Sequence, residues 1–125
     1  MKDLQERRHF LRASLDQFLT ETAGGNSRIA RVVDISEGGL RYLSPRDCSP
    51  AVGSVINVEF TLPGEENTIK AKAVVTGKRK NSSTEETSAC FMVIDGRHAG
   101  QIRSWVVARK RAEIFEALRR QHLGN

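Results

Sequence analysis

Arg28-Ile-Ala-Arg-Val-Val-Asp-Ile-Ser-Glu-Gly-Gly-Leu-Arg-Tyr-Leu43 is the stretch that decides the fold of this chain. Its first half is rich in β-branched residues, which favours a strand. Ser36-Glu-Gly-Gly39 then breaks that strand. After the break, Leu40 and Tyr42 alternate with Arg41, as in a strand with one buried face. The stretch therefore predicts two strands joined by a tight glycine turn, as a hairpin or a corner.

The β pattern continues on both sides of this stretch. Residues 55–62, 68–78 and 88–94 predict further strands, and residues 13–20 fit either a strand or a short helix. The alternation is clear in Val58, Phe60 and Leu62, which we expect to face the core together. The polar segment from residue 78 to 86 predicts a mobile loop. Short strands at this spacing predict a small antiparallel barrel or sandwich.

The end of the chain has a different pattern. Between Gly100 and Gln121 there is no Gly or Pro, and helix-forming residues dominate. Residues spaced at i, i+3, i+7 and i+10 predict one packing face of this helix. They are Trp105, Ala108, Ala112 and Phe115. We therefore expect an arm at residues 1–12, a barrel at 13–99 and a helix at 100–125, all within one domain.

Composition excludes several classes of function. The chain has 125 residues and a formal charge of +5, which favours an anionic partner without choosing one. It has no apolar run long enough to span a bilayer, and its first residues lack an apolar signal core, so a cytoplasmic location is expected. Cys48 and Cys90 are then reduced thiols, with Cys90 in the core. The histidines match no metal-binding spacing, and no residues suggest a nucleophile, so we expect no enzyme and no metal.

Two short motifs are candidates for binding. Arg8 and Arg12 form an Arg-x-x-x-Arg pair in the arm, and Asp34-Ile-Ser-Glu-Gly-Gly39 forms an Asp-x-Ser-x-x-Gly turn after a strand. Each motif has an ordinary explanation. The arginines can simply be solvated, and the second motif can be a β-turn capped by Asp and Ser. Their order, their spacing and the strands that follow them carry more information than either motif alone.

In this combination the chain resembles the PilZ domain family from Glu6 to about Arg111. Further similarities are Pro50-Ala-Val-Gly53 before a strand, and the closing strand with Phe91 and Asp95. The resemblance implies a mainly β fold, namely a six-stranded antiparallel PilZ-type β-barrel with a flexible N-terminal arm and a C-terminal α-helix. It also implies a bacterial receptor in second-messenger signalling, which regulates processes such as motility or biofilm formation.

The ligand implied by the resemblance is the cyclic dinucleotide c-di-GMP, with no other cofactor. The residues that would bind it are Arg7, Arg8, Arg12, Asp34, Ser36, Gly39 and Arg41. A guanidinium can bind a phosphate or the O6 and N7 of guanine, and it can also stack on a purine. The Asp34 carboxylate suits the N1–H and N2–H₂ of guanine. Ser36 can brace the turn, and Gly39 can let ligand and backbone approach.

One position departs from the family pattern. Many PilZ domains have a large aromatic residue about where Thr76 stands, and threonine cannot stack on guanine. An arginine then has to supply the stacking, or the affinity is lower. The number of ligand molecules bound, one or an intercalated pair, also stays open.

Other functions stay open at this stage. The chain could be an adaptor that keeps the fold but binds only proteins, or a nucleic-acid-binding barrel that uses its basic runs at 78–80 and 109–111. As a receptor it needs an unidentified output protein. Phe115 and Leu118 lie beyond the helical turns that a small barrel can cover. They predict either a surface for a homodimer or partner, or a helix that bends back along the barrel.

Overall fold

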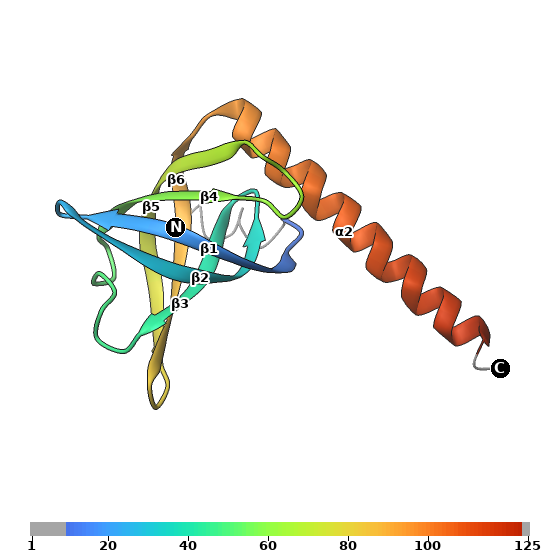
Figure 1. Cartoon of the computed structure of the whole chain (residues 1–125), viewed down its shortest axis with the longest axis horizontal. Coiled ribbons are helices and arrows are strands. Elements are labelled where there is room, and N and C mark those ends of the chain that lie inside the picture. The colour runs from blue at the N-terminus through green and yellow to red at the C-terminus, as the bar shows by residue number, and fades with distance from the viewer. Residues whose placement is uncertain (1–9, 124–125) are drawn as a thin grey trace.

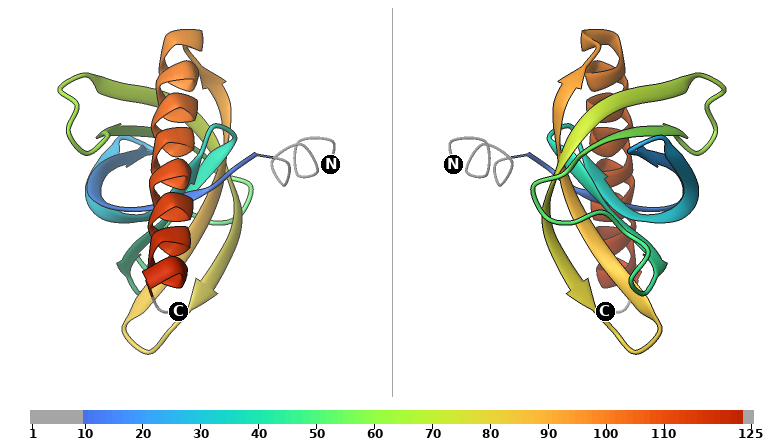
Figure 2. Two further views of the ribbon diagram at one scale, coloured as in Figure 1. Left: turned by 90° about the vertical axis from the view of Figure 1, so that its right-hand side faces the viewer. Right: turned by 90° about the vertical axis from the view of Figure 1, so that its left-hand side faces the viewer.

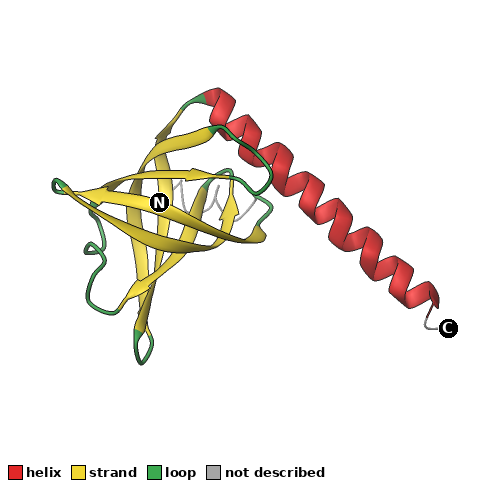
Figure 3. Cartoon of the chain, viewed as in Figure 1, coloured by secondary structure: helices red, strands yellow, loops and turns green. Residues whose placement is uncertain are grey.

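The structure is a computed structural model that describes residues 10–123 as a closed β-barrel followed by a long helix (Figure 1). The strands are β1 (Ala13–Ala23), β2 (Asn26–Ser36), β3 (Gly39–Pro45), β4 (Val55–Thr61), β5 (Thr68–Lys80) and β6 (Thr84–Ile94), and the helix is α2 (Gly96–Leu123). The barrel order is β1-β2-β3-β6-β5-β4, with antiparallel pairs throughout and β4 returning to β1. The six-stranded antiparallel barrel with a C-terminal helix is confirmed (Figure 3).

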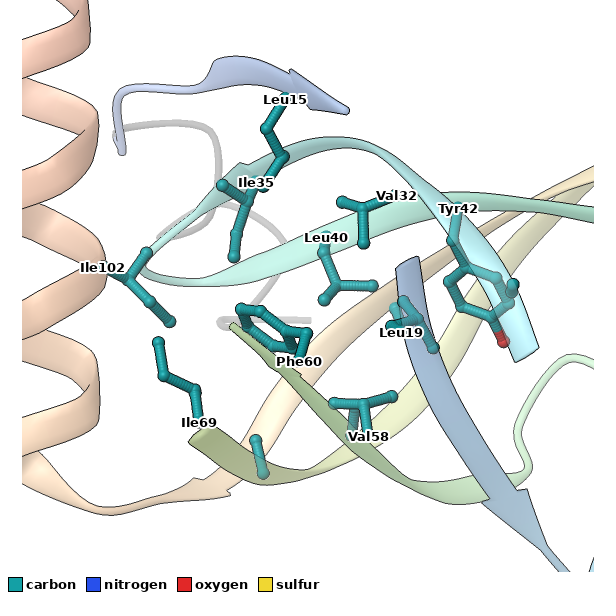
Figure 4. Packing of buried hydrophobic residues seen from close by; sticks show 14 of the residues in the cluster. Leu15, Leu19, Val32, Ile35, Leu40, Tyr42, Val58, Phe60, Ile69 and Ile102 are labelled. Atoms are coloured by element: carbon teal, nitrogen blue, oxygen red, sulfur yellow. The ribbon is translucent and has the colours of Figure 1, made fainter. Parts of the chain in front are cut away.

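The barrel interior is filled by apolar side chains from every second residue along the strands, which face inward (Figure 4). Leu40 and Tyr42 are buried side by side on β3, while Val58 and Phe60 fill the same core from β4. This alternation follows from the strand geometry, in which successive side chains point to opposite faces. Cys90 is buried, as predicted.

A buried acid lies inside the barrel beside Tyr42. The Tyr42 hydroxyl donates a hydrogen bond to Glu21 Oε2, and Arg28 Nε lies 3.2 Å from Glu21 Oε1. Burial, followed by the hydrogen bond to this carboxylate, raises the pKa of the Tyr42 hydroxyl well above its usual range. These contacts satisfy a charge that would otherwise be costly to bury.

The predicted loop at residues 78–86 is wrong, because most of it forms a hairpin. β5 continues to Lys80 and β6 begins at Thr84, so only residues 81–83 connect the two strands. Arg79 pairs with Glu86 and Lys80 pairs with Glu85 across the hairpin. Opposite charges in such pairs stabilise strands that look like a polar loop in sequence. Residues 13–20, which fitted two structures, lie in a strand that extends to Ala23.

The helix begins at Gly96, four residues earlier than predicted. Asp95 caps it, since Asp95 Oδ1 accepts a hydrogen bond of 2.8 Å from the Arg97 backbone N–H. This bond lowers the pKa of the Asp95 carboxyl. The start of a helix depends on such local caps, and here the cap outweighs the two glycines in the first turns.

The predicted packing face of the helix is largely wrong. Ile102 and Val106 are buried against the barrel, and Ile102 points from α2 into the barrel end towards Ile69 (Figure 4). Of the predicted stripe only Trp105 packs against the core, and the other three residues are exposed. The barrel end contacts only a short part of the helix, so two residues at i and i+4 are enough to cover it.

Beyond these turns α2 leaves the barrel as a straight rod (Figure 1). The side chains of residues 111–122 are all exposed. The alternative in which the helix bends back along the barrel is therefore wrong. Within residues 10–123, no helix is both long and apolar enough to cross a membrane.

Candidate ligand-binding site

Asp34 lies on the outer face of the barrel because β2 contains a β-bulge. Val32 pairs with Tyr42 on β3, whereas Asp34 pairs with Arg41, so Val33 is an extra residue on β2. Without the bulge, Asp34 would share the inward direction of Val32. The bulge reverses the alternation and sets the Asp34 carboxylate opposite Arg41, whose side chain points outward.

The Asp34 carboxylate binds two arginines. Arg12 Nη1 donates to Asp34 Oδ1 at 2.7 Å, from the segment just before β1. Arg41 Nε donates to Asp34 Oδ2 at 2.8 Å, and Arg41 Nη2 donates to the same oxygen. The hydrogen bond to Asp34 raises the pKa of the Arg41 guanidinium. Both oxygens of this nearly buried acid are thus engaged by charged donors.

The chain of charges continues past Arg41. Arg41 Nη1 lies 3.3 Å from Glu86 Oε1, and Arg79 Nη2 lies 2.8 Å from Glu86 Oε2. Positive and negative groups therefore alternate from Arg12 to Arg79 across β2, β3, β6 and β5. This arrangement holds three guanidinium groups on one face of the barrel while compensating each of them.

A hollow of about 270 Å³ lies beside Arg41 on this face, and its lining is Arg41, Gly77, Lys78, Arg79, Glu86 and Ser88. Gly77 and Ser88 pair across β5 and β6, and the absent side chain of Gly77 and the small one of Ser88 leave the space open. Thr76 is the extra residue of a bulge next to Gly77, and its hydroxyl donates to the Ser88 carbonyl oxygen at 3.3 Å. The hollow is thus flanked by arginines and has no aromatic ring in its lining.

The turn between β2 and β3 is braced by Ser36. Its Oγ accepts a hydrogen bond of 3.1 Å from the Gly38 backbone N–H, and the residue is completely buried. Gly39 pairs with Cys90, and a Cβ on Gly39 would lie 2.2 Å from the carbonyl oxygen of Ala89. Gly39 is therefore required by the close approach of β3 and β6. The ligand contact expected of it stays a prediction.

The structure brings Arg12, Asp34 and Arg41 together and sets Ser36 and Gly39 in the adjoining turn. The predicted residues Arg7 and Arg8 lie outside the described residues. A second hollow of about 190 Å³ adjoins the same turn, with a lining of Phe10, Leu11, Glu37, Arg103, Val106 and Val107. The end of the arm, the turn and the helix therefore meet beside the site.

Sequence reasoning missed Glu86 and Arg79, because residues 78–86 were predicted to form a mobile loop. A signal was present. Three basic residues at 78–80 and two acidic residues at 85–86 flank a short polar connection, as in a hairpin with charged cross-strand pairs. Among the described residues, no group of His, Cys, Asp and Glu could hold a metal ion.

The barrel and this face define a class of protein, a small β-barrel module whose outer arginines suit an anionic ligand. The family model for the PilZ domain matches residues 6–108, and the chain belongs to this family. No curated protein sequence matches the chain significantly.

Several solved structures share the fold. Bacillus subtilis MotI/DgrA, an inhibitor of motility, has a TM-score of 0.77 at 18% identity, over 85% of this chain and 52% of that protein. The Escherichia coli YcgR PilZ domain with c-di-GMP has a TM-score of 0.70 at 17% identity, over 89% of this chain and 97% of that domain. The complex of K. pneumonia MrkH with c-di-GMP has a TM-score of 0.68 at 20% identity, over 91% of this chain and 55% of that protein. This chain therefore spans about half the length of MotI/DgrA and of MrkH.

Proposed function

We propose that this chain is a receptor for c-di-GMP, with no catalytic activity of its own, and that it binds the ligand on the outer face of β2, β3, β6 and β5. The observation that carries the proposal is the Asp34 carboxylate held between Arg12 and Arg41 at the Asp-x-Ser-x-x-Gly turn of a PilZ barrel. The YcgR and MrkH structures that share this fold contain c-di-GMP, which supports the choice of ligand.

In this proposal the ligand displaces Arg12 from Asp34. A guanine that donates its N1–H and N2–H₂ to the carboxylate needs the oxygen to which Arg12 now donates. Arg12 is then free to donate to a ligand phosphate, where its planar fork binds two oxygens at once. Arg7 and Arg8 join Arg12 by the family pattern. Arg41 keeps Asp34 oriented and adds a further cation for the phosphates.

A guanine also fits the hollow beside Arg41. Gly77 and Ser88 leave room for a flat base, and Arg41 and Arg79 lie at its edges. A guanidinium plane can stack on a purine, so these arginines replace the aromatic residue absent at Thr76. Ser36 and Gly39 contribute by fixing the turn, and any direct bond from Ser36 to the ligand needs the turn to open.

The ligand would act by changing the arm. Phe10 and Leu11 line the hollow at the helix and lie within two residues of Arg12. A movement of Arg12 from Asp34 to a phosphate therefore shifts them relative to α2. This exposes a different surface to an output protein, and the ligand favours that state by its differential affinity. In this proposal the receptor acts in the cytoplasm, and its arm, barrel and helix together form one domain.

Thermal unfolding tests the choice of ligand. A ligand that binds only the folded state stabilises it, by about 2.7 kcal/mol at a hundredfold excess over Kd. We expect c-di-GMP to raise Tm by several degrees. Cyclic di-AMP, which lacks the N1–H and N2–H₂ donors for Asp34, should leave Tm unchanged. Equal shifts with both nucleotides would contradict the role of Asp34, and no shift with either would favour an adaptor that binds only proteins.

A further inference from the structure

The distal half of α2 carries an apolar stripe that nothing in the barrel covers. Ile114 and Leu118 lie one turn apart on one helical face, and Phe115 lies at its edge. The exposed fractions are 59% for Ile114, 70% for Phe115 and 61% for Leu118. Apolar side chains grouped in this way on an exposed surface are typical of an interaction site.

This stripe is not a continuation of the face that packs on the barrel. Ile102 and Val106 make the barrel contact, and Leu118 follows Val106 by twelve residues, which is about 120° around the helix axis. The stripe of Ile114, Phe115 and Leu118 therefore points away from the barrel-facing side of the helix. The left view of Figure 2 shows α2 along its whole length in front of the barrel.

The charges around the stripe are sorted by sign. Lys110 and Arg111 each lie three or four residues from a stripe residue, and so they border the stripe. Glu113 and Glu116 follow Val106 and Ile102 by seven and fourteen residues, which sets them on the barrel-facing side. The stripe therefore has basic borders, while the acidic groups of the distal helix lie on another face.

Existing ion pairs do not remove this asymmetry. Lys110 Nζ, at the border of the stripe, lies 3.3 Å from Glu113 Oε2. Exposed pairs of this kind contribute only about 0.2–1 kcal/mol, so the basic groups can exchange partners at little cost.

Charge also argues against two other occupants. A second copy of this helix would bring Lys110 and Arg111 against basic residues, since the glutamates point elsewhere. A lipid surface needs a helix with a long, strongly segregated apolar face. Here the exposed large apolar residues described in the distal half, Ile114, Phe115 and Leu118, span only a short segment.

We propose that the stripe of Ile114, Phe115 and Leu118 docks against an amphipathic helix of an output protein whose apolar residues are bordered by Asp and Glu. Two helices with apolar stripes pack side by side, and opposite charges at the borders select the partner. A helical extension without tertiary packing is only marginally stable in water, so docking also stabilises residues 111–122. This surface is separate from the nucleotide site and does not depend on the proposed ligand.

Two synthetic helical peptides test the proposal with the full chain in the absence of nucleotide. Both carry the same leucine stripe, bordered by Glu in one and by Lys in the other. Fluorescence anisotropy should give an affinity at least tenfold higher for the Glu-bordered peptide, and 0.5 M salt should weaken it. Hydrogen exchange should slow at backbone amides within residues 111–122 when that peptide binds.

A matched pair of variants locates the surface. Leu118→Gln removes a stripe residue and should weaken peptide binding at least tenfold. Ala117→Gln introduces the same glutamine side chain at the neighbouring position, which is not a stripe residue, and should leave binding unchanged. Equal affinity for the two peptides would overturn the proposal. So would a dimer in analytical ultracentrifugation that Leu118→Gln dissociates, or binding to phosphatidylglycerol vesicles that Leu118→Gln abolishes. None of these readouts involves c-di-GMP, so failure here is distinguishable from failure of the receptor function.

Discussion

Asp34 accepts hydrogen bonds from arginines on both of its oxygens, and this sets the chemistry of the site before any ligand arrives. Its partners, Arg12 and Arg41, come from segments that meet only in the folded barrel. Removing either partner would leave a nearly buried carboxylate with less compensation, which is costly. In the proposed function, a guanine that binds Asp34 has to displace Arg12, which lowers its affinity.

Gly39 gives a sharp test at the scale of a single residue. Gly39→Ala forces a Cβ to within 2.2 Å of the Ala89 carbonyl oxygen, so β3 and β6 must separate locally. We expect a loss of unfolding free energy of about 1–3 kcal/mol, typical of overpacking. Chemical denaturation measures it.

Gly77→Ala is the matched control for this change. A Cβ there meets its nearest atom, the Ser88 Cβ, only at 4.0 Å, so the barrel accommodates it. We expect the unfolding midpoint of Gly77→Ala to stay close to that of the wild type. Equal stability of the two variants would contradict the role given to Gly39 in the β3–β6 contact.

The sequence motifs predicted that Arg12, Asp34 and Arg41 lie together, and Asp34 does contact both arginines. That these residues bind the ligand stays a prediction. The bulge at Val33 could not be predicted, because strict alternation gives Asp34 the inward direction of Val32. Gly39 was expected at the turn, but its close contact with Ala89 joins residues fifty positions apart, which local pattern does not reveal.

At the scale of elements, the β5–β6 hairpin explains why a polar segment is ordered. Its basic and acidic residues face one another across the two strands, as in the pair of Arg79 and Glu86. The inward alternation of Val58, Phe60 and Leu62 was predicted correctly because buried apolar residues repeat there. The hairpin tip was not, because its stability comes from cross-strand charge pairs and not from apolar periodicity.

Glu85 in this hairpin links stability to pH. Ser49 Oγ donates to Glu85 Oε2 at 2.5 Å, and Lys78 Nζ lies 3.5 Å from Glu85 Oε1. The Ser49 hydrogen bond, and then Lys78, lower the pKa of the Glu85 carboxyl in the folded state. Its stabilising contribution is therefore present above the pKa of an unfolded glutamate, about 4.3, and is lost as pH falls through the folded pKa.

Glu85→Gln should remove this dependence. We expect the wild type to lose stability between pH 6 and pH 3, and the variant to lose less over the same range. Denaturation midpoints at each pH measure the difference. Glu66→Gln changes an exposed loop glutamate and should keep the wild-type slope. A Glu85→Gln slope as steep as that of the wild type would show that Glu85 does not contribute.

The helix shows the limit of periodicity at this scale. Its existence was predicted, yet its barrel contact falls on Ile102 and Val106 instead of the stripe from Trp105 to Phe115. The helix has more than one apolar face, and its packing on the barrel determines which of them is buried. The face left over is the one that we assign to a partner.

At the scale of the whole molecule, the closed barrel is a rigid platform without open strand edges. The ends of the arm and of the β2–β3 turn meet the helix at one place, where Phe10 and Glu37 line the same hollow as Val106. A ligand bound at Asp34 therefore acts next to the only described helix. The receptor account thus needs no movement of the barrel itself, only of the arm.

The most direct test is a calorimetric titration of c-di-GMP into the wild type, Arg12→Ala and Arg31→Ala. Arg31 is the control, because it also forms an arginine–aspartate ion pair, at 2.9 Å, but with Asp16 and not with Asp34. We predict saturable binding by the wild type and by Arg31→Ala, and at least tenfold weaker binding by Arg12→Ala, about 1.4 kcal/mol or more. No heat from folded wild type at tens of micromolar ligand, or undiminished binding by Arg12→Ala, would contradict the account.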